Sequence, residues 1–369
     1  MPGRSESTGP ASAVPDVPAS PTDAERVARH HPLLRYILRR LGISVLLLIG
    51  VTLVTFILTN LVPGDPALAN LGEQAGSDPE IVAAYKAHFG LDKPLPVQYW
   101  IYLVNLVHGD LGESQLTHQP VLADLKSAVP ATMEIAIGAI VLSVLIGVAF
   151  GVIGAIRRGK VVDQTLRVIS LVGISVPTFW LALVAFYVFS FKLDIAPGSG
   201  RLSPELDPPP HVTGLYTLDS LLAGQWHTYL DACAHLLLPT LVLTAYTVGL
   251  LTRFTRTAVL EVLDADFVRA ARAKGLRSRT VLTRYVLRAA LVPVLTVTGL
   301  AFGSLLSGTV LVESVFGWPG LGAYAYQAAS HLDLPGVMGV GLVVGFTYLV
   351  INFIVDLLYG LIDPRVRVQ

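Results

Sequence analysis

The chain has 369 residues, of which 53% are hydrophobic and only 14% are charged, whereas soluble domains carry about 25% charged residues. This composition indicates a membrane protein, and a formal net charge of zero gives the chain as a whole no attraction for nucleic acid. The single cysteine, Cys233, excludes an internal disulfide and a cysteine-rich metal cluster.

The first 32 residues are expected to form a disordered tail. Six prolines punctuate a stretch that is otherwise rich in Ser, Ala and Gly, and such a composition cannot bury a core. A cleaved signal peptide is not expected, because the apolar run that follows starts late, is long and lacks a small-residue cleavage site.

Six membrane spans are predicted from stretches that contain no Asp, Glu, Lys or Arg. Each stretch is 21 to 24 residues long, and a helix needs about 20 residues to cross the hydrocarbon core. The predicted spans are residues 41–64, 135–156, 168–191, 232–252, 289–312 and 334–355. The sequence therefore predicts an all-α integral membrane protein, with a transmembrane domain over residues 33–369.

The basic residues are distributed unevenly between the connections. The N-terminus, the connections after the second and fourth spans, and the C-terminus carry 21 of the 26 Lys and Arg residues. By the positive-inside rule, both termini and the connection at residues 253–288 are cytoplasmic. The connection at residues 63–129 is then an outer segment. Its aromatic residues Tyr99, Trp100 and Tyr102 are read either as a docking surface or as anchors at the membrane interface.

Small residues and prolines recur inside the spans. Three glycine pairs have four-residue spacing, Gly147/Gly151, Gly299/Gly303 and Gly341/Gly345, which lets helix backbones approach closely. Pro177, Pro239 and Pro293 are expected to kink or loosen their spans. A gated pathway can use such weak points, but ordinary helix packing is the interpretation we favour.

Ionisable residues of the spans lie near the span ends, at Glu134, His235 and Asp356. A proton-coupled carrier is expected to place carboxylates near mid-membrane. We therefore expect these groups to bond to neighbours or to reach headgroups, and secondary transport is disfavoured. The chain also has no phosphate-binding G-x-x-x-x-G-K-[ST] loop, no H-E-x-x-H and no G-x-S-x-G, so we expect neither an enzyme nor a cofactor on this chain.

The basic connection contains a predicted surface helix at residues 266–274. Phe267, Ala270, Ala271 and Lys274 share one face of it, and Gly275 ends it in a left-handed conformation. Ser278 is placed to cap a second helix that runs from Arg279 toward Ala290. The small residues favour docking of another protein, and the alternative is an amphipathic helix that rests on anionic headgroups.

Several motifs of the chain resemble those of the permease subunits of ABC importers. RAARAKGL at residues 269–276, with Pro293 downstream, is similar to the EAA-type coupling motif, although Arg269 stands where the bare consensus has Glu, a form usual in the peptide-permease branch. Other matches are LVPGDP at 61–66, FGLDKPLPVQY at 89–99, GDLGES at 109–114, VPAT at 129–132, VESVFGWPGLG at 312–322 and LIDPR at 361–365. The segment at residues 212–224 resembles dipeptide permeases of the B type in particular.

This resemblance implies a type I ABC importer permease fold with a cytoplasmic coupling helix, in the bacterial cytoplasmic membrane. It implies four kinds of partner: a second homologous permease subunit, two ATP-binding subunits that hydrolyse ATP, an extracytoplasmic substrate-binding protein, and a di- or oligopeptide substrate. The residues implied in coupling to the ATPase are Phe267, Arg269, Ala270, Ala271, Arg272, Lys274, Gly275 and Leu276. The alternatives are a nickel or glutathione permease, and a self-sufficient channel or carrier whose inner helix only binds lipid.

Overall fold

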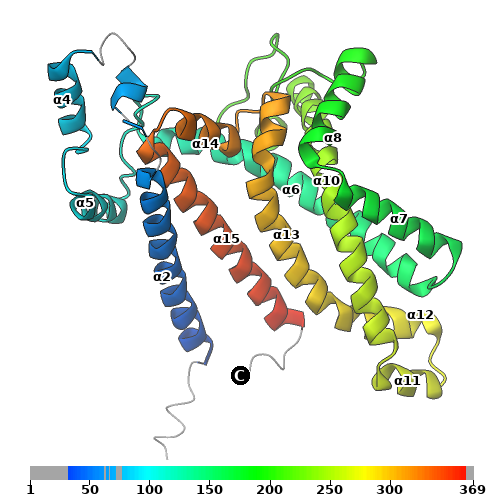
Figure 1. The fold of residues 1–369 in the computed structure, drawn as a ribbon. Coiled ribbons are helices and arrows are strands. Elements are labelled where there is room, and N and C mark those ends of the chain that lie inside the picture. Colours follow the sequence, from blue (N-terminus) through cyan, green and yellow to red (C-terminus); the bar gives the residue numbers. More distant parts are fainter. Residues whose placement is uncertain (1–31, 62–63, 66, 72–76, 363–369) are drawn as a thin grey trace, which may run out of the picture. The chain divides into compact units, whose positions relative to one another are not determined.

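The computed structural model describes residues 32–61, 64–65, 67–71 and 77–362 (Figure 1). Within them the regular secondary structure is helical, apart from one isolated bridge between Glu113 and Pro120. The predicted all-α fold is confirmed. The long or membrane-associated helices are α2 (Pro32–Leu61), α6 (Val121–Ile156), α7 (Val161–Ser175), α8 (Thr178–Ala185) with the π-helical η1 (Phe186–Lys192), α10 (Trp226–Leu263), α13 (Leu287–Phe316) and α15 (Leu334–Ile362).

Shorter helices form the connections. They are α4 (Pro79–His88), α5 (Leu95–Val107), α9 (Tyr216–Leu222), α11 (Asp266–Ala273), α12 (Ser278–Thr280), the π-helical η2 (Val281–Val286) and α14 (Leu321–Ser330). The chain divides into two compact units, residues 1–45 and residues 46–369, and the contacts described below belong to the second. The tail predicted at residues 1–32 lies outside the described residues except for Pro32.

Among the described residues, five helices are long and apolar enough to cross a membrane, and there are six spans if the pair α7 and α8–η1 counts as one. The second, fourth and fifth predicted spans lie inside longer helices, because a helix continues past the membrane into polar sequence. Residues 135–156, for example, are the second part of α6 (Val121–Ile156).

The third predicted span, residues 168–191, is not one straight helix. It breaks at Val176 and Pro177, where α7 and the following helix make an angle of 94°. Pro177 has no N–H to donate to the preceding turn, and its ring disfavours a helical conformation at Val176, whose ψ is 123°. Pro239 and Pro293, by contrast, lie within the continuous helices α10 and α13.

The three glycine pairs lie where helices pack closely, as predicted. A Cβ added at Gly151 would lie 2.5 Å from Thr255 Cβ of α10, and one at Gly303 would lie 2.7 Å from the ring of Tyr348 of α15. One at Gly341 would lie 2.8 Å from Thr55 of α2. Each pair therefore brings a different pair of helices into contact.

The ionisable groups at the span ends bond to neighbours, as predicted for Glu134 and His235. Arg201 donates to Glu134 Oε2 at 2.7 Å, and Thr217 donates to Oε1 from its backbone amide and its hydroxyl at 2.8 and 2.6 Å. The Arg201 guanidinium also lies over the ring of Tyr216, 3.5 Å from its centroid. A ring nitrogen of His235 lies 2.9 Å from the carbonyl oxygen of Asp231. These charges join α6 to the α8–α10 connection.

Asp219 organises the segment at residues 212–224, which carries the resemblance to dipeptide permeases. Its carboxylate accepts from the amide and hydroxyl of Thr213 at 2.8 and 2.7 Å, and from the amide of Gly214 at 2.8 Å. Burial opposes ionisation, but these hydrogen bonds outweigh it and lower the pKa of Asp219 below its usual value. The segment at residues 212–224 thus has a structural role: Asp219 holds Gly214 in place, and the carbonyl of Gly214 accepts a hydrogen bond from Arg201.

Candidate functional site: the α10–α13 connection and a charge-free cavity

The short helix α11 follows α10 and contains most of the predicted coupling residues (Figure 1). It ends with two backbone hydrogen bonds, from Gly275 to the carbonyl of Arg272 at 2.9 Å and from Leu276 to that of Ala271 at 3.4 Å. Gly275 has a φ of +77°, so the prediction that it ends the helix in a left-handed conformation is confirmed. The helix itself ends at Ala273, and Lys274 is the C-cap.

The inner face of α11 packs against the chain itself. Val268 and Ala271 are buried in an apolar cluster, together with residues of α6, α10, η2 and α13: Ala155, Ala258, Val259, Val281, Val286, Ala290 and Val294. Ala271 was predicted to share a face with Phe267, Ala270 and Lys274, but it is buried against the core while those three residues are exposed. Ala271 and Val268, which the sequence analysis did not select, seat the helix on the core.

The outer face of α11 presents the other predicted residues, Phe267, Arg269, Ala270, Arg272, Lys274, Gly275 and Leu276, all of which are exposed. Phe267 is 48% exposed and Leu276 is 38% exposed, so both apolar side chains are available to a partner. Arg269 forms an ion pair with Asp266 on the same helix. An aromatic ring surrounded by Arg and Lys suits a protein groove with an apolar floor and an acidic rim.

The second helix of the connection differs from its prediction. Ser278 begins α12 and makes no capping hydrogen bond, since the N-cap position is taken by Arg277. The helix does not stop near Ala290, because α12, η2 and α13 follow one another without interruption as far as Phe316. The connection therefore contains one short helix and the extended start of the fifth span.

Ion pairs tie the start of α7 and the α6–α7 connection to α10. Arg256 donates to both oxygens of Asp163, from Nε at 2.7 Å and from Nη2 at 3.0 Å, and the amide of Gly159 donates to the same carboxylate at 3.0 Å. Arg158 lies 3.8 Å from Asp264 at the end of α10. With the apolar cluster under α11, these contacts join α6, α7, α10 and α13 into one packed body.

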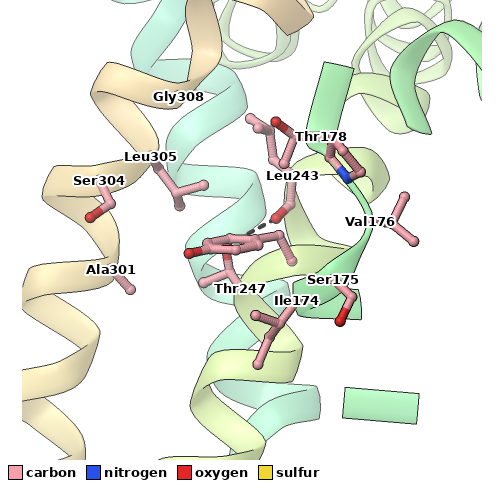
Figure 2. A pocket seen from close by; sticks show the side chains of 12 residues that line it. Ile174, Ser175, Val176, Thr178, Leu243, Thr247, Ala301, Ser304, Leu305 and Gly308 are labelled. Carbon is pink, nitrogen blue, oxygen red and sulfur yellow. Dashed lines mark hydrogen bonds between the residues drawn. The ribbon is translucent and has the colours of Figure 1, made fainter. Parts of the chain in front are cut away.

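A cavity of about 470 Å³ lies where the third span breaks, between α7, α8, α10 and α13 (Figure 2). Its lining residues are Ile174, Ser175, Val176, Pro177, Thr178, Leu243, Tyr246, Thr247, Ala301, Ser304, Leu305 and Gly308. The volume is within the range of small-molecule sites. The sequence flagged Pro177 as a weak point, but it gave no signal for the residues of α10 and α13 that complete the wall.

The cavity is lined by hydroxyl and apolar groups, and none of its lining residues carries a carboxylate, ammonium, guanidinium or imidazole. Figure 2 shows Ser304 on α13 across from the Ser175–Thr178 break, with Thr247 of α10 between them. The hydroxyl of Thr247 donates to the carbonyl of Leu243 at 3.0 Å. Such walls can exchange hydrogen bonds with a polar solute but cannot neutralise a charge.

The chain is similar to known membrane components of transport systems. The family model described as binding-protein-dependent transport system inner membrane component matches residues 143–368, and the corresponding N-terminal model matches residues 33–136. A solved structure entitled inward facing conformations of the MetNI methionine ABC transporter aligns with a TM-score of 0.47 and 16% identity, covering 66% of this chain and 97% of that chain.

Curated relatives match along nearly their whole length. The probable D,D-dipeptide transport system permease protein DdpB of Escherichia coli K12 is 46% identical over 322 residues, which cover 87% of this chain and 94% of that protein. The di/tripeptide transport system permease protein DppB of Pseudomonas aeruginosa is 43% identical, and the alignment covers 91% of this chain and 100% of that protein. The dipeptide transport system permease protein DppB of Escherichia coli K12 is 39% identical, and the alignment covers 91% of this chain and 99% of that protein.

Proposed function

The chain belongs to the family of binding-protein-dependent transport system inner membrane components, and we propose that it is the subunit through which short peptides pass in an ATP-driven importer. Members of this family are non-catalytic permease subunits of ABC transporters. The likeness to relatives named for dipeptide and di/tripeptide transport carries the substrate class. A self-sufficient channel or carrier does not agree with membership of this family.

The proposed importer contains a second homologous permease subunit, two ATP-binding subunits and an extracytoplasmic substrate-binding protein. The exposed face of α11 supports docking to an ATP-binding subunit, because Phe267 and Leu276 are apolar and exposed beside Arg269, Arg272 and Lys274. The excess of Lys and Arg in alternate connections supports a bacterial inner-membrane orientation with both termini and α11 in the cytoplasm.

The charge-free cavity supports a route rather than a tight binding site. A dipeptide carries an ammonium and a carboxylate, and desolvating either without a counter-charge is expensive. The lining offers hydroxyls from Ser175, Thr247 and Ser304 but no fixed charge, so a peptide crosses this region hydrated. Selectivity then resides in the substrate-binding protein.

The proposal is tested by uptake of a radiolabelled dipeptide into cells that lack their own copy of this subunit and are supplied with the chain. We expect uptake to return, to require ATP, and to be inhibited by unlabelled dipeptides. Failure of dipeptide uptake to return, with ATP-dependent uptake of labelled nickel or glutathione restored in its place, would support the nickel or glutathione alternative instead.

A further inference from the structure

The helix α5 (Leu95–Val107) has its apolar side turned away from the chain. Val97, Trp100, Ile101 and Val104 follow the i, i+3, i+4, i+7 spacing of one helical face, and all four are exposed, Trp100 by 66%. Val107 continues this face and is 84% exposed. A helix on a water-exposed surface has the opposite arrangement, with polar side chains outward.

The polar side chains of α5 point toward the chain. Gln98, Tyr99, Tyr102 and Asn105 are half-buried. The amide nitrogen of Gln98 donates to the carbonyl of Lys93 at 2.7 Å. The hydroxyl of Tyr99 lies 3.1 Å from the hydroxyl of Thr52 and donates to the carbonyl of Ile49 at 3.2 Å, both on α2. Gln98 and Tyr99 thus find hydrogen-bond partners within the chain.

These contacts place α5 beside the membrane-crossing part of α2. Ile49, Thr52 and Phe56 lie within the apolar segment Gly42–Leu61, and the rings of Phe56 and Tyr99 are 5.2 Å apart. At a rise of about 1.5 Å per residue, Phe56 and Thr52 lie ~8 and ~14 Å before the end of α2 at Leu61. The apolar face of an interfacial helix is buried about 5–10 Å below the headgroup boundary. The contact at Phe56 lies at that depth, and the Tyr99 hydroxyl reaches deeper, to Thr52.

Several backbone groups at both ends of α5 are satisfied within the chain, which a low-dielectric environment favours. Pro94 and Pro96 have no N–H, and the amides of Val97 and Gln98 both donate to the carbonyl of Pro94. At the other end, the amides of His108 and Gly109 donate to Asn105 and Leu106, and a ring nitrogen of His108 lies 2.8 Å from the carbonyl oxygen of Val104.

We propose that α5 is a membrane-embedded interfacial helix, whose face of Val97, Trp100, Ile101 and Val104 lies among lipid acyl chains in the leaflet nearest the C-terminal end of α2. With 13 residues it is too short to span the bilayer, which needs about 20. The membrane-crossing helix α2 also exposes apolar side chains, for example Val54 and Leu58. The inference does not depend on which solute the chain transports.

Nitroxide labelling tests the proposal in the assembled transporter, reconstituted in vesicles of phosphatidylethanolamine and phosphatidylglycerol. Single cysteines replace Trp100 or Val104 in a Cys233→Ser background. Leu58→Cys is the lipid-facing control, and Glu80→Cys, exposed on α4, is the water-facing control. We expect labels on α5 to relax with oxygen in preference to a water-soluble nickel chelate, as at Leu58.

Two outcomes would overturn the proposal. Collision with the nickel chelate to the extent seen at Glu80 would place the face in water. Shielding of both α5 labels from oxygen and nickel would mean that another protein, such as a second permease subunit or a binding protein, covers the face.

A second measurement uses only the conservative substitution Trp100→Phe and so does not depend on the folding of the cysteine variants. Vesicles of lipids brominated on the acyl chain should quench the tryptophan fluorescence of the unsubstituted protein, and Trp100→Phe should lower the quenched fraction. Trp318 is 1% exposed and bonded to the carbonyl of Ala131, so it provides an internal signal shielded from lipid. Equal quenching with and without Trp100 would contradict embedding of α5.

Discussion

Backbone conformation, and not lack of space, is the reason that position 275 requires glycine. Its φ is +77°, and a Cβ added there would meet no atom within 4 Å. We therefore expect Gly275→Trp to fold and insert, with a local strain of roughly 1 kcal/mol for a non-glycine residue in the left-handed region. If α11 docks in an ATPase groove, the added ring prevents closure, and dipeptide uptake is lost while the chain remains in the membrane.

Gly224 provides a matched control for this substitution. Its φ is +69°, and it also has open space around it, but it lies between α9 and α10 and not beside α11. Gly224→Trp should have the same strain and retain uptake. Normal uptake by Gly275→Trp, or equal loss in both variants, would contradict docking at α11.

The sequence alone does not show which face of α11 is buried and which is exposed. The helix has only eight residues, with apolar side chains at Phe267, Val268, Ala270 and Ala271, so two neighbouring stripes are possible. The position of Gly275 and the end of the helix could be predicted, because they depend on local backbone chemistry. The choice of Val268 and Ala271 as the inner stripe depends on the apolar cluster of α6, α10 and α13, which only the fold assembles.

At the scale of elements, the sequence predicted the existence of the membrane helices better than their shape. Charge-free length located the spans, because a charge in the hydrocarbon core is expensive. Of Pro177, Pro239 and Pro293, only Pro177 breaks its helix, while α10 and α13 continue past Pro239 and Pro293. The local sequence signal is the same in each case, so it does not distinguish them. In the structure α7 lies against α10, whereas α8, after the break, packs on both α10 and α13.

The α7–α10 contact depends on missing side chains. A Cβ at Gly249 would lie 2.5 Å from the carbonyl oxygen of Ser170, and one at Gly173 would lie 2.6 Å from that of Ala245. We expect Gly249→Ala to force these helices apart and to destabilise the protein by about 1–3 kcal/mol, the usual range for overpacking. The measurement is the midpoint of thermal unfolding of the purified protein in detergent.

Gly50→Ala on α2 is the comparison, since its Cβ would meet nothing within 4 Å. Because alanine is the better helix former, this variant should keep or raise the midpoint. Equal midpoints for the two variants would show that α7 and α10 separate without cost, against the close packing described above.

At the scale of the whole molecule, the 21 of 26 basic residues in alternate connections predict the orientation. In a Cys233→Ser background, Ser278→Cys beside α11 should resist a membrane-impermeant maleimide in intact cells and react after lysis. Ser77→Cys and Glu205→Cys, in the opposite connections, should react in intact cells. All three positions are exposed, so differences report the side of the membrane and not burial. Reaction of Ser278→Cys from outside would show that the predicted orientation is wrong and that α11 does not lie in the cytoplasm.

Transport through a cavity without charge has a consequence that one substitution can measure. If the peptide passes Ser304, then Ser304→Asp places a carboxylate beside its route, where a unit charge about 6 Å away contributes roughly 3 kcal/mol at an effective dielectric constant of about 20. In the reconstituted importer, at saturating binding protein, the rate for a Lys-containing dipeptide relative to an Asp-containing one should shift by at least about tenfold. Ser304→Asn, which is similar in size and uncharged, should leave that ratio unchanged. In the unsubstituted protein, the transport rate of each peptide should follow the affinity of the binding protein for that peptide. No shift in the Ser304→Asp variant would place the route elsewhere. A large preference by side-chain charge in the unsubstituted protein, among peptides bound equally well, would mean that the chain contains a charged selective site outside this cavity.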